Sequence, residues 1–187
     1  YKEVVDGDFG RVLNKRASYE AARHFERLDN HDAAAEAYQQ MLNRGDRGAR
    51  TVHGLLRAIE ATGDSMEAQR LRHRLIREYP SSRDALVAVR GSEPLQGEKE
   101  TFYGAVCYAR HGKYRSAARL LKGLIRSSDE EVWKGRAQLE LGKVYYGKRD
   151  YRSARTAFRK AYRTYRVPKG LLEEARSEIR LGADIDG

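Results

Sequence analysis

Residues 135–166 read GRAQLELGKVYYGKRDYRSARTAFRKAYRTYR, and this stretch predicts two helices joined by a short turn. Leu141 and Tyr145 are four residues apart, so they share one face of the first helix, and Ala154 and Phe158 do the same on the second. One such hairpin has too little apolar surface to be stable alone. The pattern therefore predicts further hairpins packed beside it.

The order Leu-Gly-x2-Tyr followed by Ala-x3-Phe resembles the tetratricopeptide repeat, a helical hairpin of about 34 residues. Similar patterns occur earlier in the chain, and Ala34 and Ala68 are separated by 34 residues, the period of the repeat. The next equivalent alanines are Ala117 and Ala154. We therefore expect an all-α fold, a TPR-like α-α superhelix built as a helical-hairpin solenoid.

The spacing also predicts how the chain is divided. Ala117 follows Ala68 by 49 residues, so about 15 residues are inserted between two pairs of hairpins. This insertion could hold a short helix around Ala85–Val89, and it is either a surface loop or a hinge. The expected segments are a partial preceding hairpin (1–14), two TPR-like hairpins (15–82), an inserted linker (83–97), two more TPR-like hairpins (98–168) and a C-terminal capping helix (169–187).

Composition limits the class of protein. The chain has 187 residues, of which 40% are hydrophobic and 34% charged, and only three are proline, which suits a helix-rich protein with a real core. No apolar run approaches the roughly 18–20 residues that a transmembrane helix needs. The start shows no signal-peptide pattern and Tyr1 is not an initiator methionine, so we expect a mature chain or a piece of a longer one.

The positive charge is concentrated near the end of the chain. The net charge is +10, and residues 134–169 contain twelve lysines and arginines against two acidic residues. Five arginines on the second helix of the last hairpin follow three- and four-residue steps and form one basic stripe. The stripe consists of Arg152, Arg155, Arg159, Arg163 and Arg166.

Two interpretations of this basic stripe remain open. It is either a solvated outer face or a site for an anionic partner such as an acidic protein, lipid headgroups or a cell-wall polymer, because guanidinium suits carboxylate and phosphate. Nucleic acid is disfavoured, since the aromatic residues are not interleaved with the arginines as a stacking surface requires.

The resemblance also implies a partner-binding surface. In this family the first helices of successive hairpins line the concave face, where partner peptides usually lie. Carried onto this chain, the candidates form a mixed aromatic and basic surface that would suit an extended acidic or apolar segment, although some, Phe102 among them, could instead pack between hairpins. They are Tyr19, Arg23, His53, Arg57, Phe102, Arg110, Arg136, Lys143 and Tyr146.

No catalytic, metal or cofactor site is expected. The chain lacks G-x4-G-K-[ST] and G-x-G-x-x-G phosphate loops, and its five histidines are scattered without ligand spacing. Cys107, the single cysteine, excludes an internal disulfide and lies in an apolar sequence, which favours a buried, inert thiol. We therefore expect a non-enzymatic scaffold that binds a protein or peptide partner, with self-association through a terminal hairpin as a further possibility.

A finer resemblance suggests an alternative role. The phrases AAAEAYQQMLNRG, LLRAIEATGD and REYPSS, followed by the basic last hairpin, resemble the superhelical non-catalytic region of bacterial soluble lytic transglycosylases, and also the repeat region of envelope assembly lipoproteins. This resemblance implies an accessory domain that positions anionic peptidoglycan strands. It also favours a periplasmic or cell-envelope location over the cytoplasm.

Overall fold

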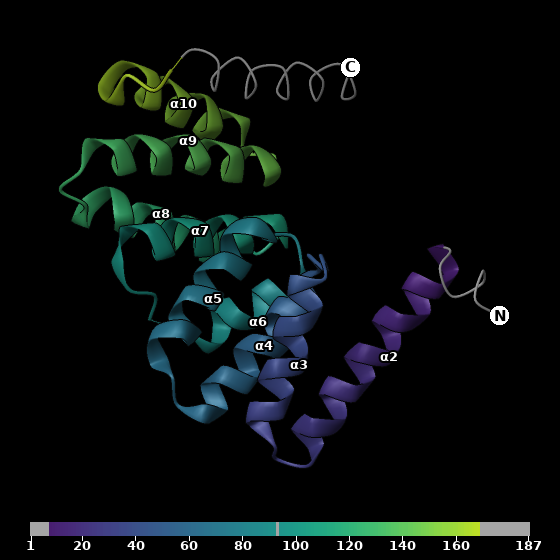
Figure 1. The fold of residues 1–187 in the computed structure, drawn as a ribbon. Helices are drawn as coiled ribbons and strands as arrows, with labels where there is room; N and C mark the ends of the chain where they lie inside the picture. The colour runs from purple at the N-terminus through teal and green to yellow at the C-terminus, as the bar shows by residue number, and fades with distance from the viewer. Residues whose placement is uncertain (1–7, 93, 169–187) are drawn as a thin grey trace. The chain divides into compact units, whose positions relative to one another are not determined.

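The structure is a computed structural model, and it describes residues 8–92 and 94–168 (Figure 1). All regular secondary structure within these residues is helical, which confirms the predicted all-α class. The helices are α2 (Asp8–Arg27), α3 (His31–Asn43), α4 (Ala49–Thr62), α5 (Ser65–Glu78), α6 (Arg83–Gly91), α7 (Gly97–Arg110), α8 (Tyr114–Ser127), α9 (Glu131–Gly147) and α10 (Tyr151–Tyr165).

The helices belong to two compact units, Tyr1–Gly91 and Ser92–Gly187. Within each unit, every helix packs against the next one along the chain, as in a helical-hairpin solenoid. In the first unit α2 also contacts α4, and α4 contacts α6; in the second unit α7 contacts α9. The first helices of successive hairpins therefore lie side by side within each unit.

The turns between paired helices repeat the same backbone geometry. The residue five positions before each repeat alanine has a positive φ: 54° at Asp29, 90° at Gly63, 67° at Gly112 and 62° at Arg149. In three of these four turns the residue that directly follows is an Asn or Asp. Its side chain caps the second helix by accepting a hydrogen bond from a backbone N–H. The caps are Asn30, Asp64 and Asp150.

The repeat alanines occupy equivalent buried positions. Ala34, Ala68, Ala117 and Ala154 are all at most 4% exposed, and each lies in the first turns of a second helix. Because alanine adds only a methyl group, the two helices of a hairpin can approach closely at this point. The spacing of 34, 49 and 37 residues between these positions therefore marks four hairpins in the described residues.

The segment predicted as an inserted linker contains a helix. α6 fills its first part, and the boundary between the two units falls at Gly91 and Ser92, inside residues 83–97. At the other end of the first unit, α2 starts at Asp8 and continues across residue 14, where the first predicted segment ends. The predicted C-terminal capping helix, 169–187, lies outside the described residues, and the division into segments stays a prediction.

Candidate partner-binding surfaces

Two of the predicted binding arginines share one carboxylate in the first unit. Arg57 of α4 donates from Nη2 to both oxygens of Glu26 on α2, at 2.9 and 3.1 Å, and from Nε at 3.3 Å. Arg23 Nη1 lies 3.2 Å from the same carboxylate. Burial acts to lower the pKa of Arg57, but the Glu26 carboxylate outweighs it, and the pKa lies above its ordinary value.

The other two predicted residues of this unit also have partners within the chain. His53 Nδ1 lies 2.9 Å from Asp84 Oδ1, which links α4 to α6. The ring of Tyr19 packs edge-on against Tyr38 at 5.7 Å, and the guanidinium of Arg50 lies 5.1 Å from the centre of the Tyr19 ring. The structure thus places these four side chains on α2 and α4, where Arg23, Arg57 and His53 each lie beside a carboxylate of the first unit.

In the second unit, an aromatic cluster joins α7 to α9. Phe102 is 8% exposed, and its ring lies 5.5 Å from Trp133 and 5.4 Å from Tyr103. Arg136 stacks its guanidinium 5.3 Å from the Trp133 ring. Phe102 therefore serves packing. Trp133 and Tyr103 are members of this surface that sequence reasoning missed, although Trp133 lies one helical turn before Arg136 and is the only tryptophan in the chain.

The remaining predicted residues of the second unit differ in how they are paired. Lys143 Nζ forms an ion pair with Glu140 at 3.0 Å, and the ring of Tyr146 packs edge-on against Tyr151 at 5.5 Å. Arg110, at the end of α7, is exposed, and so is Arg136. Within residues 8–92 and 94–168 neither Arg110 nor Arg136 has a carboxylate partner. Among the described residues, these two guanidinium groups therefore have no carboxylate that would compete with an anion.

Four arginines of the basic stripe lie on α10, and Arg166 follows the end of this helix with a φ of 49°, so it does not continue the helical stripe as predicted. All five of its arginines are exposed, and none forms an ion pair with any other residue that the structure describes. The helix turns its buried face, which includes Ala154 and Phe158, toward a hydrophobic cluster with Leu139 and Val167. The stripe is therefore accessible along its length, as a solvated face or an anion-binding surface would be.

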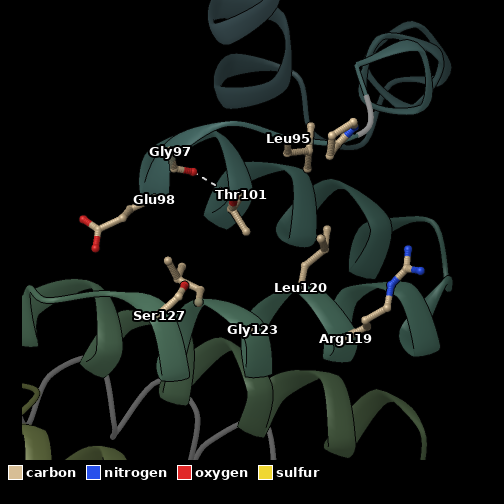
Figure 2. Close-up of a pocket in the computed structure, with 10 residues that line it drawn as sticks. Leu95, Gly97, Glu98, Thr101, Arg119, Leu120, Gly123 and Ser127 are labelled. Atoms are coloured by element: carbon tan, nitrogen blue, oxygen red, sulfur yellow. Dashed lines mark hydrogen bonds between the residues drawn. The ribbon is translucent and has the colours of Figure 1, made fainter.

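A pocket of about 660 Å³ opens between the start of α7 and α8 (Figure 2). Leu120 and Leu124 of α8 and Leu95 before α7 give it an apolar lining, and Figure 2 shows Glu98 and Arg119 toward its opposite ends. The Thr101 hydroxyl donates to the Gly97 carbonyl at 2.7 Å. Such a pocket can accept an apolar side chain.

The described part of the chain contains no group of three or more His, Cys, Asp or Glu side chains placed to hold a metal ion. Cys107 is fully buried, and burial raises the pKa of its thiol to about 11, which leaves little thiolate at neutral pH. Among the described helices, none combines the length and the apolar character needed to cross a membrane.

These features define a helical-repeat protein whose surfaces are suited to binding. The family model of the tetratricopeptide repeat matches residues 1–49 and 107–166, more than half of the chain. The chain therefore belongs to the tetratricopeptide repeat family, whose repeats are generally protein-interaction scaffolds and generally not catalytic. No curated protein sequence gives a significant match.

Proposed function

We propose that this protein is a non-enzymatic scaffold that binds an acidic partner segment on the α7–α9 face of its second unit. This face carries Tyr103 and Arg110 of α7 and Trp133 and Arg136 of α9. The observation that carries this proposal is the difference between the units: Arg23 and Arg57 share Glu26, whereas Arg110 and Arg136 are exposed and pair with no carboxylate among residues 8–92 and 94–168. An exposed arginine without a partner has the strongest remaining capacity for a charge-assisted hydrogen bond.

The aromatic cluster gives this face its second kind of contact. Stacking on Trp133 orients the guanidinium of Arg136, so less side-chain freedom is lost when its planar fork binds a carboxylate. Trp133 and Tyr103 are only half-buried and can contact apolar side chains of the partner. The face therefore favours a segment in which acidic residues alternate with apolar or aromatic ones.

Selection of random twelve-residue peptides displayed on phage tests this proposal. We expect enrichment of peptides rich in Asp and Glu, with binding that weakens between about 50 and 200 mM salt. The double variant Arg110→Glu/Arg136→Glu should lose the binding of the selected peptides. Arg16→Glu/Arg47→Glu, an equal charge change at exposed positions of the first unit, should keep it. Selected peptides without acidic residues, or equal binding by both variants, would contradict the proposal.

The basic stripe of α10 supports an alternative function. Its five exposed arginines pair with no carboxylate that the structure describes, and they would let an accessory domain of a lytic transglycosylase hold anionic cell-wall strands, which would place the protein in the cell envelope. Co-sedimentation with isolated peptidoglycan tests this role. Binding that Arg155→Glu/Arg159→Glu/Arg163→Glu abolishes would favour it over the peptide scaffold, and absence of co-sedimentation at low salt would exclude it.

A further inference from the structure

A second pocket, of about 360 Å³, lies between α9 and α10 and is separate from the α7–α9 face. Gln138, Leu141 and Tyr145 line it from α9, and the side chains from α10 include Arg152, Thr156 and Lys160. Its volume is at the lower end of the range for ligand pockets in proteins. All of these residues belong to one hairpin of the second unit.

Gln138 gives this pocket a polar group at a position that the repeat pattern reserves for a tryptophan. In the repeat pattern W-x2-L-G-x2-Y a tryptophan stands three residues before the leucine, which in this hairpin is Leu141. Here the position holds glutamine, which is smaller and polar. The replacement leaves space beside Leu141 and puts an amide group there in place of an indole ring.

The amide of Gln138 has no partner of its own. The side chain is only 5% exposed, and no hydrogen bond to it is formed by any residue that the structure describes. The amide is not among the fully buried polar atoms without a partner, so it reaches the open space of the pocket, where water or a ligand can bond to it. An amide both donates and accepts, which makes it a natural partner for a peptide group.

Two cationic side chains line the pocket from α10. Arg152 and Lys160 are exposed, and neither forms an ion pair within the described residues. They are eight residues apart on α10, which corresponds to about 12 Å along the helix axis. Thr156 lies midway between them; its hydroxyl donates to the Arg152 carbonyl at 3.0 Å and can still accept a hydrogen bond.

We propose that this pocket, the Gln138 groove, binds an extended peptide segment with two acidic side chains four residues apart. An extended chain covers about 3.4 Å per residue, so four residues span about 14 Å, which is comparable with the axial separation of about 12 Å between Arg152 and Lys160. The carboxylates pair with Arg152 and Lys160, the Gln138 amide pairs with a peptide group between them, and Leu141 and Tyr145 form the apolar wall. This site does not depend on the α7–α9 face.

Nuclear magnetic resonance of the ¹⁵N-labelled full chain tests the proposal. The probes are acetyl-Glu-Ala-Ser-Ala-Glu-amide, its isomer acetyl-Glu-Glu-Ala-Ser-Ala-amide and free glutarate. We expect the first peptide to shift the Gln138 side-chain amide and the backbone amides of Tyr145 and Thr156 in a saturable way. It should do so at a concentration about tenfold lower than the isomer or glutarate, since only the first peptide reaches both cations.

Two variants locate the binding. Gln138→Trp restores the residue of the repeat pattern, fills the groove and should abolish the shifts at Tyr145 and Thr156 while circular dichroism stays helical. Should this variant unfold, Arg152→Gln/Lys160→Gln, which changes only exposed side chains, still tests the site and should weaken binding at least tenfold. Arg115→Gln/Arg126→Gln, an equal charge change at exposed positions of α8, is the matched control and should bind as the wild type does.

The results that would overturn the proposal are specific. They are the absence of a saturable shift, equal binding of glutarate and the spaced peptide, or unchanged binding by Gln138→Trp or by Arg152→Gln/Lys160→Gln. Binding lost in Arg110→Glu/Arg136→Glu would assign the peptide to the α7–α9 face and would also count against the Gln138 groove. Retention in that variant separates this site from the one in the proposed function.

Discussion

The ring of Phe158 lies directly against the backbone of Gly142: a Cβ atom added at Gly142 would lie 2.5 Å from Phe158 Cε1 and 2.6 Å from Cδ1. Separations this short do not occur between non-bonded atoms in proteins, so an added methyl group would force the ring or the helix to move. Phe158 belongs to a buried cluster with Ala154 and Ala161. Close contact between α9 and α10 therefore depends on the absence of a side chain at position 142.

Gly142→Ala is expected to lower the free energy of unfolding. Overpacking costs about 1–3 kcal/mol, and the better helix propensity of alanine offsets about 0.5–1 kcal/mol, so we expect a net loss of about 1–2 kcal/mol in urea unfolding. Gly123→Ala in α8 is the matched control, since a Cβ there meets nothing within 4 Å. It should be neutral or stabilising, and equal losses in both variants would contradict the packing argument.

The pairing of Arg57 with Glu26 should be measurable as a coupling energy. A double-mutant cycle with Glu26→Ala and Arg57→Ala should give a coupling of about 1 kcal/mol, because a charge-assisted hydrogen bond is strong but the Arg57 side chain is 36% exposed and partly screened. The exposed pair Arg70–Glu67, at 2.8 Å, should give less than about 0.5 kcal/mol. Equal coupling in both pairs would show that the inner pair adds nothing beyond an ordinary surface contact.

Asp46 predicts a loss of stability in acid. Its carboxylate accepts hydrogen bonds from Thr51 Oγ1 at 2.7 Å and from the Gly48 N–H at 2.9 Å, and it pairs with Lys15 at 2.8 Å. Burial alone would raise the pKa of Asp46, but these partners outweigh it and hold the pKa below its ordinary value of 3.8. Because the pKa of Asp46 is lower in the folded state, its contribution to stability is fully present above the pKa of the unfolded state. This contribution is lost as the pH falls through the folded-state pKa.

Unfolding in urea at several pH values checks this expectation. The stability difference between wild type and Asp46→Asn should be largest above pH 3.8, at about 1–3 kcal/mol, and should shrink as the pH falls through the folded-state pKa. Thr51→Val removes one of the hydrogen bonds and brings the folded-state pKa of Asp46 closer to 3.8, so in that variant the pH-dependent loss should be smaller and should be complete at a higher pH. A difference that does not change with pH would mean that the Asp46 charge contributes nothing to folding.

The repeating parts of the fold could be predicted because they depend on residues close together in the sequence. A hairpin needs a small residue near the start of its second helix and a turn five positions earlier, and both follow from the spacing of alanines such as Ala34 and Ala68. Asp64 and Asp150 cap their helices through contacts only three residues long. Local rules of this kind are visible in a single sequence.

The pairing of side chains between hairpins could not be predicted in this way. Glu26 and Arg57 are 31 residues apart, as are His53 and Asp84, so each pair forms only once the helices have packed. The sequence places Arg57 on a first helix but does not show that a carboxylate already occupies it. For the same reason charge alone could not distinguish the paired arginines of the first unit from Arg110 in the second.

Cys107 provides a probe for opening of the second unit. Its thiol is fully buried and has a pKa of about 11, so at pH 8 about one thiol in a thousand would be ionised even if it were accessible. Reaction with a disulfide reagent should therefore require α7 to separate from its neighbours. We expect labelling of the native chain to be at least about 1000-fold slower than labelling of the urea-unfolded chain.

The Gly142 variant connects this labelling to packing. If Cys107 reacts only after the second unit opens, the loss of about 1–2 kcal/mol in Gly142→Ala should speed its labelling about 5- to 30-fold, because the rate follows the population of the open state. Gly123→Ala should not speed it, since no side chain is displaced there. Native labelling as fast as in the unfolded chain, or a rate insensitive to Gly142→Ala, would mean that reagent reaches Cys107 without opening the helix packing. In that case the contact between Gly142 and Phe158 would stabilise only α9 and α10, and not the hairpin before them.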